Sequence, residues 1–186
     1  MTGADLLAEM ETAAARMRSI HFEGLKSLGV QMAVLGSLSA CQHTVGMATI
    51  EDAGGGIFQP SPDGFPVCLV AVVWPEARRF GDAGLFDLVA FRSADPRKWW
   101  LRCGSAFALG EHLLDQPDPL RVVRTPADWL AAGGNALCVL DWSENSPAWS
   151  ALRVGPPLLF PDEAMRQQVR ASLVRAAPLP PMEIAA

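Results

Sequence analysis

The stretch FPVCLVAVVW, from Phe65 to Trp74, constrains the fold of this chain more than any other part of its sequence. It has no charged residue and no alternation of polar and apolar positions, so residues 66–74 are predicted to form a strand that is buried on both faces. It is far shorter than the roughly 20 apolar residues that a membrane-spanning helix needs. The chain has 186 residues, of which 50% are hydrophobic and 19% charged, and can bury such a strand in one core. We expect a soluble, cytosolic α/β protein.

The segments before this strand carry helical and glycine-rich patterns. Apolar residues at helical spacing predict an amphipathic helix from Ala4 to about Ile20, with Thr2 or Gly3 as its cap. Glycines interrupt residues 21–42, which are predicted to form a short helix followed by a strand. Residues 45–50 are predicted to form a strand and residues 52–64 a turn-rich connection.

Two further strands are expected after the buried one. Residues 85–91 and 99–103 are apolar and rich in β-forming side chains, and Asp95-Pro96 between them is a typical turn. Together with the buried strand they predict an antiparallel meander.

The last third of the sequence alternates strands with helices. The predicted order is strand 120–123, helix 125–132, strand 136–140, a turn or short helix at 147–152, strand 157–160 and helix 162–174. Thr125-Pro126 opens the first of these helices and Gly133-Gly134 closes it. This alternation predicts a small, mainly parallel sheet with flanking helices.

These patterns resemble a known family. The strands FPVCLVAVVW and LFDLVAF, the Trp-rich strand, the sequence AxxLGE at residues 106–111 and the following β-α-β order are similar to the N-terminal lobe and Toprim core of bacterial and phage DNA primases and primase-helicases. The resemblance covers about residues 65–174. The domain organisation that we expect is a helical segment at 1–43, a β-rich lobe at 44–115, a Toprim-like α/β lobe at 116–177 and a proline-rich tail at 178–186.

The resemblance implies that the family's metal site is degenerate here. In that family the first Toprim strand ends in Glu-Gly and a later strand ends in Asp-x-Asp, and these carboxylates hold the divalent metals that assist phosphoryl transfer. The corresponding positions are Arg124-Thr125 and Phe160-Pro161-Asp162. Only Asp162, with Asp141 from the intervening strand, remains as a metal candidate. We therefore expect no catalytic residues and no cofactor.

The densest group of cationic and aromatic side chains lies around residues 92–102. It comprises Arg92, Arg97, Lys98, Trp99, Trp100 and Arg102, with Arg78 and Arg79 in the preceding loop. Such a group can clasp phosphate and stack on bases of single-stranded nucleic acid. Because strand residues alternate, Trp100 and Arg102 are predicted on one face and Trp99 on the other. Alternatively, one tryptophan is core, the other packs beneath an arginine stem and the charges are solvated, which the net charge of −5 favours.

The four cysteines, Cys41, Cys68, Cys103 and Cys138, show no zinc-ligand spacing and are expected to be reduced and mostly buried. Leu38-Ser39-Ala40-Cys41 resembles the lipobox of bacterial lipoproteins. The apolar run before it is short and lies far from Met1, so lipidation through Cys41 is not expected.

Three hypotheses for function follow. The first is a non-catalytic Toprim-like accessory protein, of the kind that a phage or mobile element encodes, which binds nucleic acid or a replication protein. The second is a protein-interaction module that uses the N-terminal helix and the proline-rich tail. The third is a small metal-dependent enzyme with Asp141, Asp162 and His112 in its site. The first requires Arg124 and Asp162 at adjacent strand ends of one parallel sheet; the sequence leaves the oligomeric state open.

Overall fold

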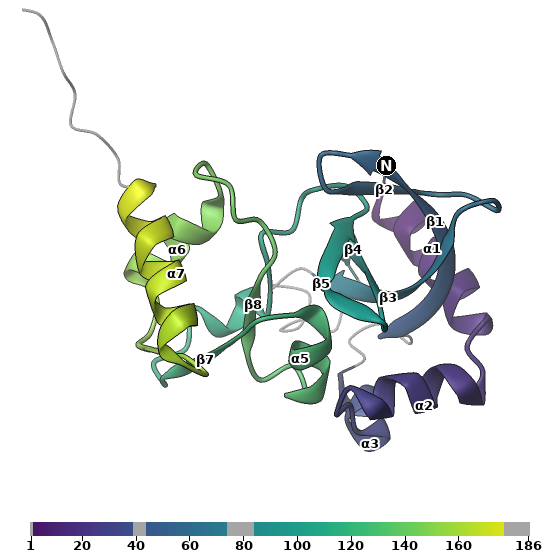
Figure 1. Cartoon of the computed structure of the whole chain (residues 1–186), viewed down its shortest axis with the longest axis horizontal. Coiled ribbons are helices and arrows are strands. Elements are labelled where there is room, and N and C mark those ends of the chain that lie inside the picture. The colour runs from purple at the N-terminus through teal and green to yellow at the C-terminus, as the bar shows by residue number, and fades with distance from the viewer. Residues whose placement is uncertain (1, 39–43, 74–83, 177–186) are drawn as a thin grey trace, which may run out of the picture.

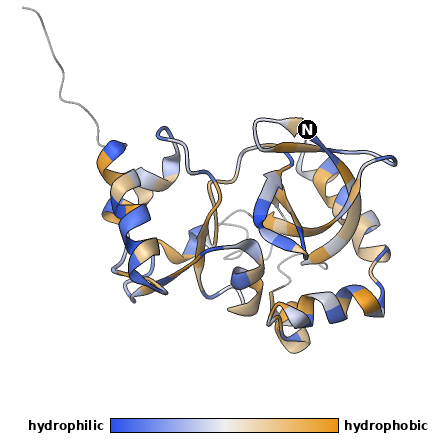
Figure 2. Ribbon diagram, viewed as in Figure 1, coloured by the Kyte–Doolittle hydropathy of each residue, from blue (hydrophilic) through white to orange (hydrophobic). Residues whose placement is uncertain are grey.

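The buried stretch forms strand β3 (Phe65–Val73), which pairs with a neighbouring strand on each side inside a closed barrel. The structure is a computed structural model that describes residues 2–38, 44–73 and 84–176. It is a mixed α/β protein with a barrel, helices around it and a second, smaller sheet (Figure 1). Figure 2 shows that apolar segments run along the strands, whereas polar segments lie mostly on the outer helices and loops.

The barrel has five strands in the order β1-β2-β5-β4-β3. The others are β1 (Val45–Gly54), β2 (Ile57–Pro60), β4 (Leu85–Arg92) and β5 (Asp95–Leu101). Neighbours are antiparallel except β2 and β5, which close the barrel through one parallel pair, Ile57 with Leu101. The sequence predicted a turn where β2 lies, because a four-residue strand between glycines is too short to show its period. Asp95 pairs with Arg92, so the β4–β5 turn lies just before the predicted Asp95-Pro96.

Helix α1 (Gly3–Ala15) packs against the barrel. Of the two predicted caps, Thr2 or Gly3, it is Thr2 that caps the helix, in a reciprocal capping box with Asp5. Its buried residues Leu6 and Met10 join the side chains that fill the inside of the barrel. A side chain at Gly46 would meet the backbone of α1 at 2.7 Å, so this glycine permits the close contact between helix and β1. The helix ends before the predicted Ile20, and α2 (Ser19–Ser27) follows.

The sequence predicted a short helix followed by a strand over residues 21–42. The described residues of this range, up to 38, form α2 and α3 (Met32–Ser37) and no strand, and residues 39–42 lie outside the described part of the chain. Leu25 of α2 and Val30, Leu35 and Leu38 are buried against the outer face of the barrel. Each strand of the closed barrel has two neighbours, although β2 and β5 meet through a single residue pair.

The second sheet has the strand order β6-β8-β7-β9. Its strands are β6 (Ala108–Leu109), β7 (Leu120–Val123), β8 (Leu137–Val139) and β9 (Leu158–Leu159). Strand β7 is parallel to both β8 and β9, and β6 is antiparallel to β8. The prediction of a small, mainly parallel sheet is confirmed.

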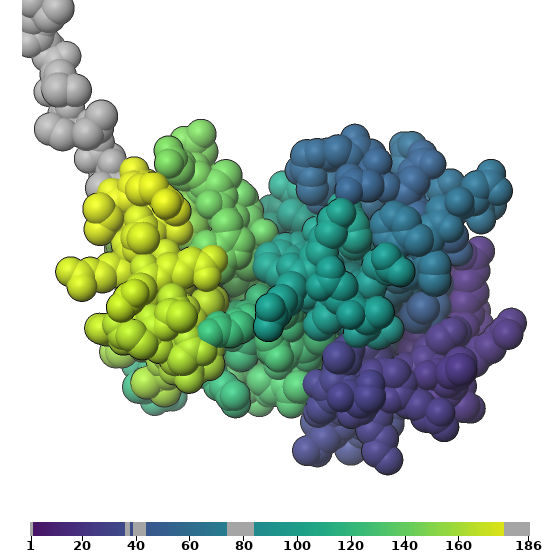
Figure 3. All heavy atoms as spheres, in the orientation of Figure 1, coloured from purple at the N-terminus to yellow at the C-terminus, as the bar shows by residue number. Residues whose placement is uncertain are grey.

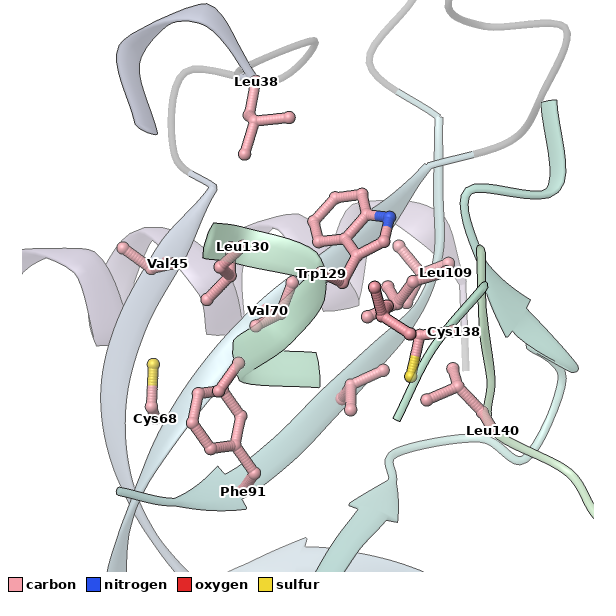
Figure 4. Close-up of a cluster of buried hydrophobic side chains, with 14 of the residues drawn as sticks. Leu38, Val45, Cys68, Val70, Phe91, Leu109, Trp129, Leu130, Cys138 and Leu140 are labelled. Atoms are coloured by element: carbon pink, nitrogen blue, oxygen red, sulfur yellow. The ribbon is translucent and has the colours of Figure 1, made fainter. Parts of the chain in front are cut away.

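Helices flank the two faces of this sheet. They are the short 3-10 helix η1 (Glu111–Leu113), α5 (Pro126–Ala131), α6 (Pro147–Val154) and α7 (Glu163–Arg175). Val122 and Leu137 point to the side of α6 and α7, where Trp149 and Met165 complete a core cluster. The other face joins α5 and the barrel in a single core (Figure 4).

The second sheet includes a strand from the residues that the sequence assigned to the β-rich lobe at 44–115. Strand β6 pairs with β8, so the second sheet already begins at Ala108 and not after residue 115. Side chains of α1 join the cluster inside the barrel, and side chains of α2 and α3 join the cluster on its outer face.

Among the described residues, no helix is both long and apolar enough to cross a bilayer. Several predictions concern positions outside the described residues: the lipobox cysteine Cys41, the loop arginines Arg78 and Arg79, and the tail at 178–186.

Candidate binding cleft

A cleft of about 470 Å³ lies between barrel strand β5 and the second sheet. Its lining residues are Arg97, Trp99, Arg124, Thr125, Trp142, Met165 and Gln168. In Figure 3, the teal residues of the barrel and the yellow residues of α7 lie on either side of green residues from the C-terminal half of the chain. Arg124 and Trp142 follow the carboxyl ends of β7 and β8, the edge at which open parallel sheets bind their ligands. The volume falls within the ~300–1,000 Å³ of small-molecule sites.

Two tryptophans in the wall of this cleft are anchored by hydrogen bonds of their indole N–H groups. The Nε1 of Trp99 donates a hydrogen bond to the carbonyl of Leu140 at 3.1 Å. The Nε1 of Trp142 donates to the carbonyl of Val139, also at 3.1 Å, and its ring packs against Trp149. Both indole N–H groups therefore already have an acceptor, in the carbonyls of consecutive residues at the end of β8. A ligand in the cleft would contact the apolar faces of the two rings.

The cationic side of the cleft consists of Arg97 and Arg124. Arg97 is exposed on β5. Arg124 forms an ion pair with Asp162, and both side chains remain partly exposed, at 38% and 47%. Asp162 also caps α7 by accepting a hydrogen bond from the Met165 backbone N–H at 2.9 Å. That backbone bond first, and Arg124 in addition, hold the pKa of Asp162 below its usual value.

Thr125 is engaged in helix capping. Its Oγ1 donates to Asp128 Oδ2 at 2.8 Å and accepts from the Asp128 backbone N–H at 3.1 Å. This hydroxyl is thus committed to the start of α5, as the sequence predicted. The cleft offers two guanidinium groups, two indole rings and the amide of Gln168, a set of groups suited to holding a planar, anionic ligand.

The two predicted Toprim positions come together. Arg124 and Asp162 lie just beyond the carboxyl ends of the adjacent parallel strands β7 and β9, and they bind each other. Phe160, which precedes Asp162, packs against the core of the second sheet.

The remaining metal candidates are not gathered into one site. Asp141 follows β8, on the opposite side of β7 from Asp162, and its Oδ1 accepts the backbone N–H of Ser143 at 2.9 Å. His112 lines a separate cavity of about 20 Å³ with Trp129. Within the described ranges, no three His, Cys, Asp or Glu side chains are grouped in a way that could hold a metal ion.

The predicted tryptophan–arginine cluster is divided between two surfaces. Trp100 is only 3% exposed, packs against the tilted ring of Phe65 with ring centroids 5.2 Å apart, and lies beneath the Nζ of Lys98. Arg102 binds Glu9 of α1 at 3.0 Å. Trp100 is therefore the core tryptophan of the alternative interpretation, and its ring is not open to a stacking base.

Arg92 lies on the same part of the barrel as Trp100, with its guanidinium 5.6 Å from the ring centre of Phe65. Among the described members of the predicted cluster, only Arg97 and Trp99 reach the cleft. The alternation along β5 was predicted correctly, but only the tertiary structure shows which face meets the core.

The sequence interpretation missed Trp142 and Gln168. Trp142 had a usable signal, because it closely follows an apolar strand of the parallel sheet, where ligand-binding residues gather. Gln168 had none, since it is one of several polar residues on α7. No family model, curated protein or solved structure matches this chain.

Proposed function

We propose that this chain is a non-catalytic accessory protein with a degenerate Toprim-like lobe, and that it binds single-stranded nucleic acid in the cleft. The observation that carries the proposal is the presence of Arg97, Arg124, Trp99 and Trp142 in one cavity. Guanidinium groups that bind phosphates next to aromatic rings that contact bases are the common elements of single-strand binding sites.

The position of Arg124 supports a site that binds without catalysis. In the family that the lobe resembles, a glutamate at this strand end helps hold cations that contact phosphate. An arginine at the same place supplies the positive charge from the protein itself and can contact a phosphate through two N–H groups. Unlike a metal ion, it does not turn bound water into a nucleophile at neutral pH. Phosphate binding would be kept while the chemistry is lost.

The net charge of −5 requires that the interaction be local. A protein without a broad positive field gains its affinity from a few phosphate contacts. For single strands, the logarithm of the binding constant falls by about 0.7 per phosphate contact for each tenfold rise in salt concentration. Two contacts therefore predict an affinity loss of about sevenfold when salt rises from about 50 to 200 mM.

The burial of α1 argues against one of the two contact surfaces that the protein-interaction hypothesis requires. It placed the contacts on the N-terminal helix and the proline-rich tail. The apolar side chains Leu6, Met10 and Ala13 of α1 are buried against the barrel at 2% exposure or less and do not form an open surface.

Fluorescence anisotropy with a labelled single-stranded DNA of about 12 nucleotides tests the proposal, a length within known single-strand site sizes. We expect Arg97→Ala and Arg124→Ala each to weaken binding by about tenfold and to reduce the salt slope by about 0.7. Asp162→Asn is expected to strengthen binding, because it frees Arg124 while its amide oxygen still caps α7.

Arg16→Ala is the matched control, since it removes one positive charge at the end of α1, outside the cleft. The affinity of this variant for single-stranded DNA should stay within about twofold of that of the wild type, because only charges that contact phosphate alter the binding free energy strongly. Absence of binding at low salt, or equal losses in Arg16→Ala and Arg124→Ala, would contradict the proposal.

A further inference from the structure

Arg124 lines two cavities. Besides the cleft, it borders a second cavity of about 270 Å³, lined by Arg121, Val123, Arg124, Asp128, Ala131, Ala132 and Pro161. Arg124 belongs to the lining of both cavities. A chain-like ligand that occupied the cleft and continued past this guanidinium would enter the second cavity.

We propose that the two cavities are consecutive nucleotide subsites, with the phosphate that links the two nucleotides held at Arg124. This inference rests on the proposed function and specifies its ligand, a strand of at least two nucleotides rather than a free mononucleotide. The larger cavity, with Trp99 and Trp142, takes the first nucleotide, and the smaller cavity takes the second.

The charges around the second cavity orient this nucleotide. Arg121 and Arg124 bring two positive charges to its lining. Asp128 brings a negative charge, and its Oδ2 is held by the backbone N–H and the hydroxyl of Thr125. A carboxylate repels phosphate but accepts hydrogen bonds from base amino groups. The phosphates of the strand therefore lie on the arginine side and the base points toward Asp128 and the apolar surface of Ala131 and Ala132.

The ion pair at Arg124 can give way to a linking phosphate. Arg124 and Asp162 are both partly exposed, and pairs in contact with solvent exchange their partners at small cost. Asp162 keeps its other role without Arg124, because its Oδ1 remains bound to the Met165 backbone N–H at the start of α7. Opening the ion pair thus leaves the helix capped.

Calorimetric titration with deoxycytidine monophosphate and with the dinucleotide d(pCpC) tests the two subsites. We expect the dinucleotide to bind about tenfold or more tightly than the mononucleotide, because the second nucleotide binds as part of an already anchored ligand. Arg121 lines only the smaller cavity, so Arg121→Ala should keep the mononucleotide affinity within about twofold of the wild-type value. The same variant should lose most of the extra affinity that the wild type shows for the dinucleotide. Arg16→Ala also removes one positive charge, but outside both cavities, and should keep the full extra affinity for the dinucleotide.

The outcomes separate this inference from the proposed function. If the mononucleotide binds and the dinucleotide binds no more tightly, the second subsite is refuted and binding in the cleft stands. A gain that persists unchanged in Arg121→Ala also refutes it. If neither ligand binds to a wild-type protein of normal thermal stability, the proposed function itself is refuted.

Discussion

At the scale of single residues, Asp87 has the most demanding environment in the described part of the chain. It is fully buried in β4, and its carboxylate accepts five backbone hydrogen bonds. The donors of Oδ1 are the N–H groups of Leu88, Arg102 and Cys103, and those of Oδ2 are the N–H groups of Ser105 and Ala106. One carboxylate thus fixes the chain where it leaves the barrel and approaches the second sheet.

Replacement of Asp87 by asparagine is expected to destabilise the fold strongly. The amide oxygen can replace only one carboxylate oxygen, and the NH₂ group then faces backbone donors that lose their acceptor. With about 1–3 kcal/mol for each buried group left unsatisfied, Asp87→Asn should lower the free energy of unfolding by about 2–4 kcal/mol. Urea denaturation followed by circular dichroism measures this loss.

The control for this change is Asp63→Asn, at an exposed position in the loop before β3. It makes the same chemical substitution and should alter stability by less than about 0.5 kcal/mol. A loss below about 1 kcal/mol for Asp87→Asn would show that the five donors find other acceptors.

At the scale of elements, the first turn of α7 is stabilised by two carboxylates. Asp162 caps the helix, and Glu163 binds Arg166 through two contacts of 2.7 Å. Arg166, and to a lesser extent Gln167, lower the pKa of Glu163 from 4.5 to about 2. The pKa of Asp162 is lowered as well, chiefly by the Met165 backbone N–H. Negative charge at a helix N-terminus also interacts favourably with the helix dipole.

These lowered pKa values predict a stability loss in acid. The folded state favours the ionised carboxylates, so their contribution is complete above the ordinary pKa of about 4.5 and disappears as pH falls through the lowered value near 2. We expect the free energy of unfolding to fall between these pH values, and to fall less steeply in Glu163→Gln, which has no carboxylate to protonate. Urea denaturation at a series of pH values checks this. An identical slope in wild type and variant would contradict the assignment.

At the scale of the whole molecule, the barrel and the second sheet share one core. Val70, Phe91 and Leu101 of the barrel belong to the same buried cluster as Trp129 of α5 and Cys138 of β8 (Figure 4). The cleft lies where the two parts meet, so its geometry depends on their contact. A core that is continuous in this way should lose its structure cooperatively.

The buried thiols Cys68 and Cys138 report on this cooperativity. Burial raises the pKa of Cys68 to about 12 and raises the pKa of Cys138 as well, so neither thiol forms a reactive thiolate near pH 8 in the folded protein. We expect iodoacetamide to modify neither cysteine in the native state, and to modify both at the same urea concentration. Mass spectrometry of the two cysteine peptides measures this, and two separate midpoints would show that barrel and second sheet unfold independently.

The sequence by itself determined those features that depend on neighbours along the chain. The uninterrupted apolar run predicted β3, and Thr125, Pro126 and the glycines after the helix predicted α5. Caps, prolines and apolar periods act over a few residues, so they can be recognised without knowledge of the fold.

Only the tertiary structure decided how distant surfaces meet. Residues 21–42 were predicted to end in a strand, whereas the described residues of this segment form α2 and α3, whose apolar side chains Leu25, Leu35 and Leu38 are buried against the barrel and α5. The choice between Trp99 and Trp100 depended on which face of β5 met the barrel interior, because alternation assigns two faces but not their surroundings. The cleft combines β5, the end of β7 and α7, and burial of apolar surface between the barrel and the second sheet is the physical reason that these segments lie together.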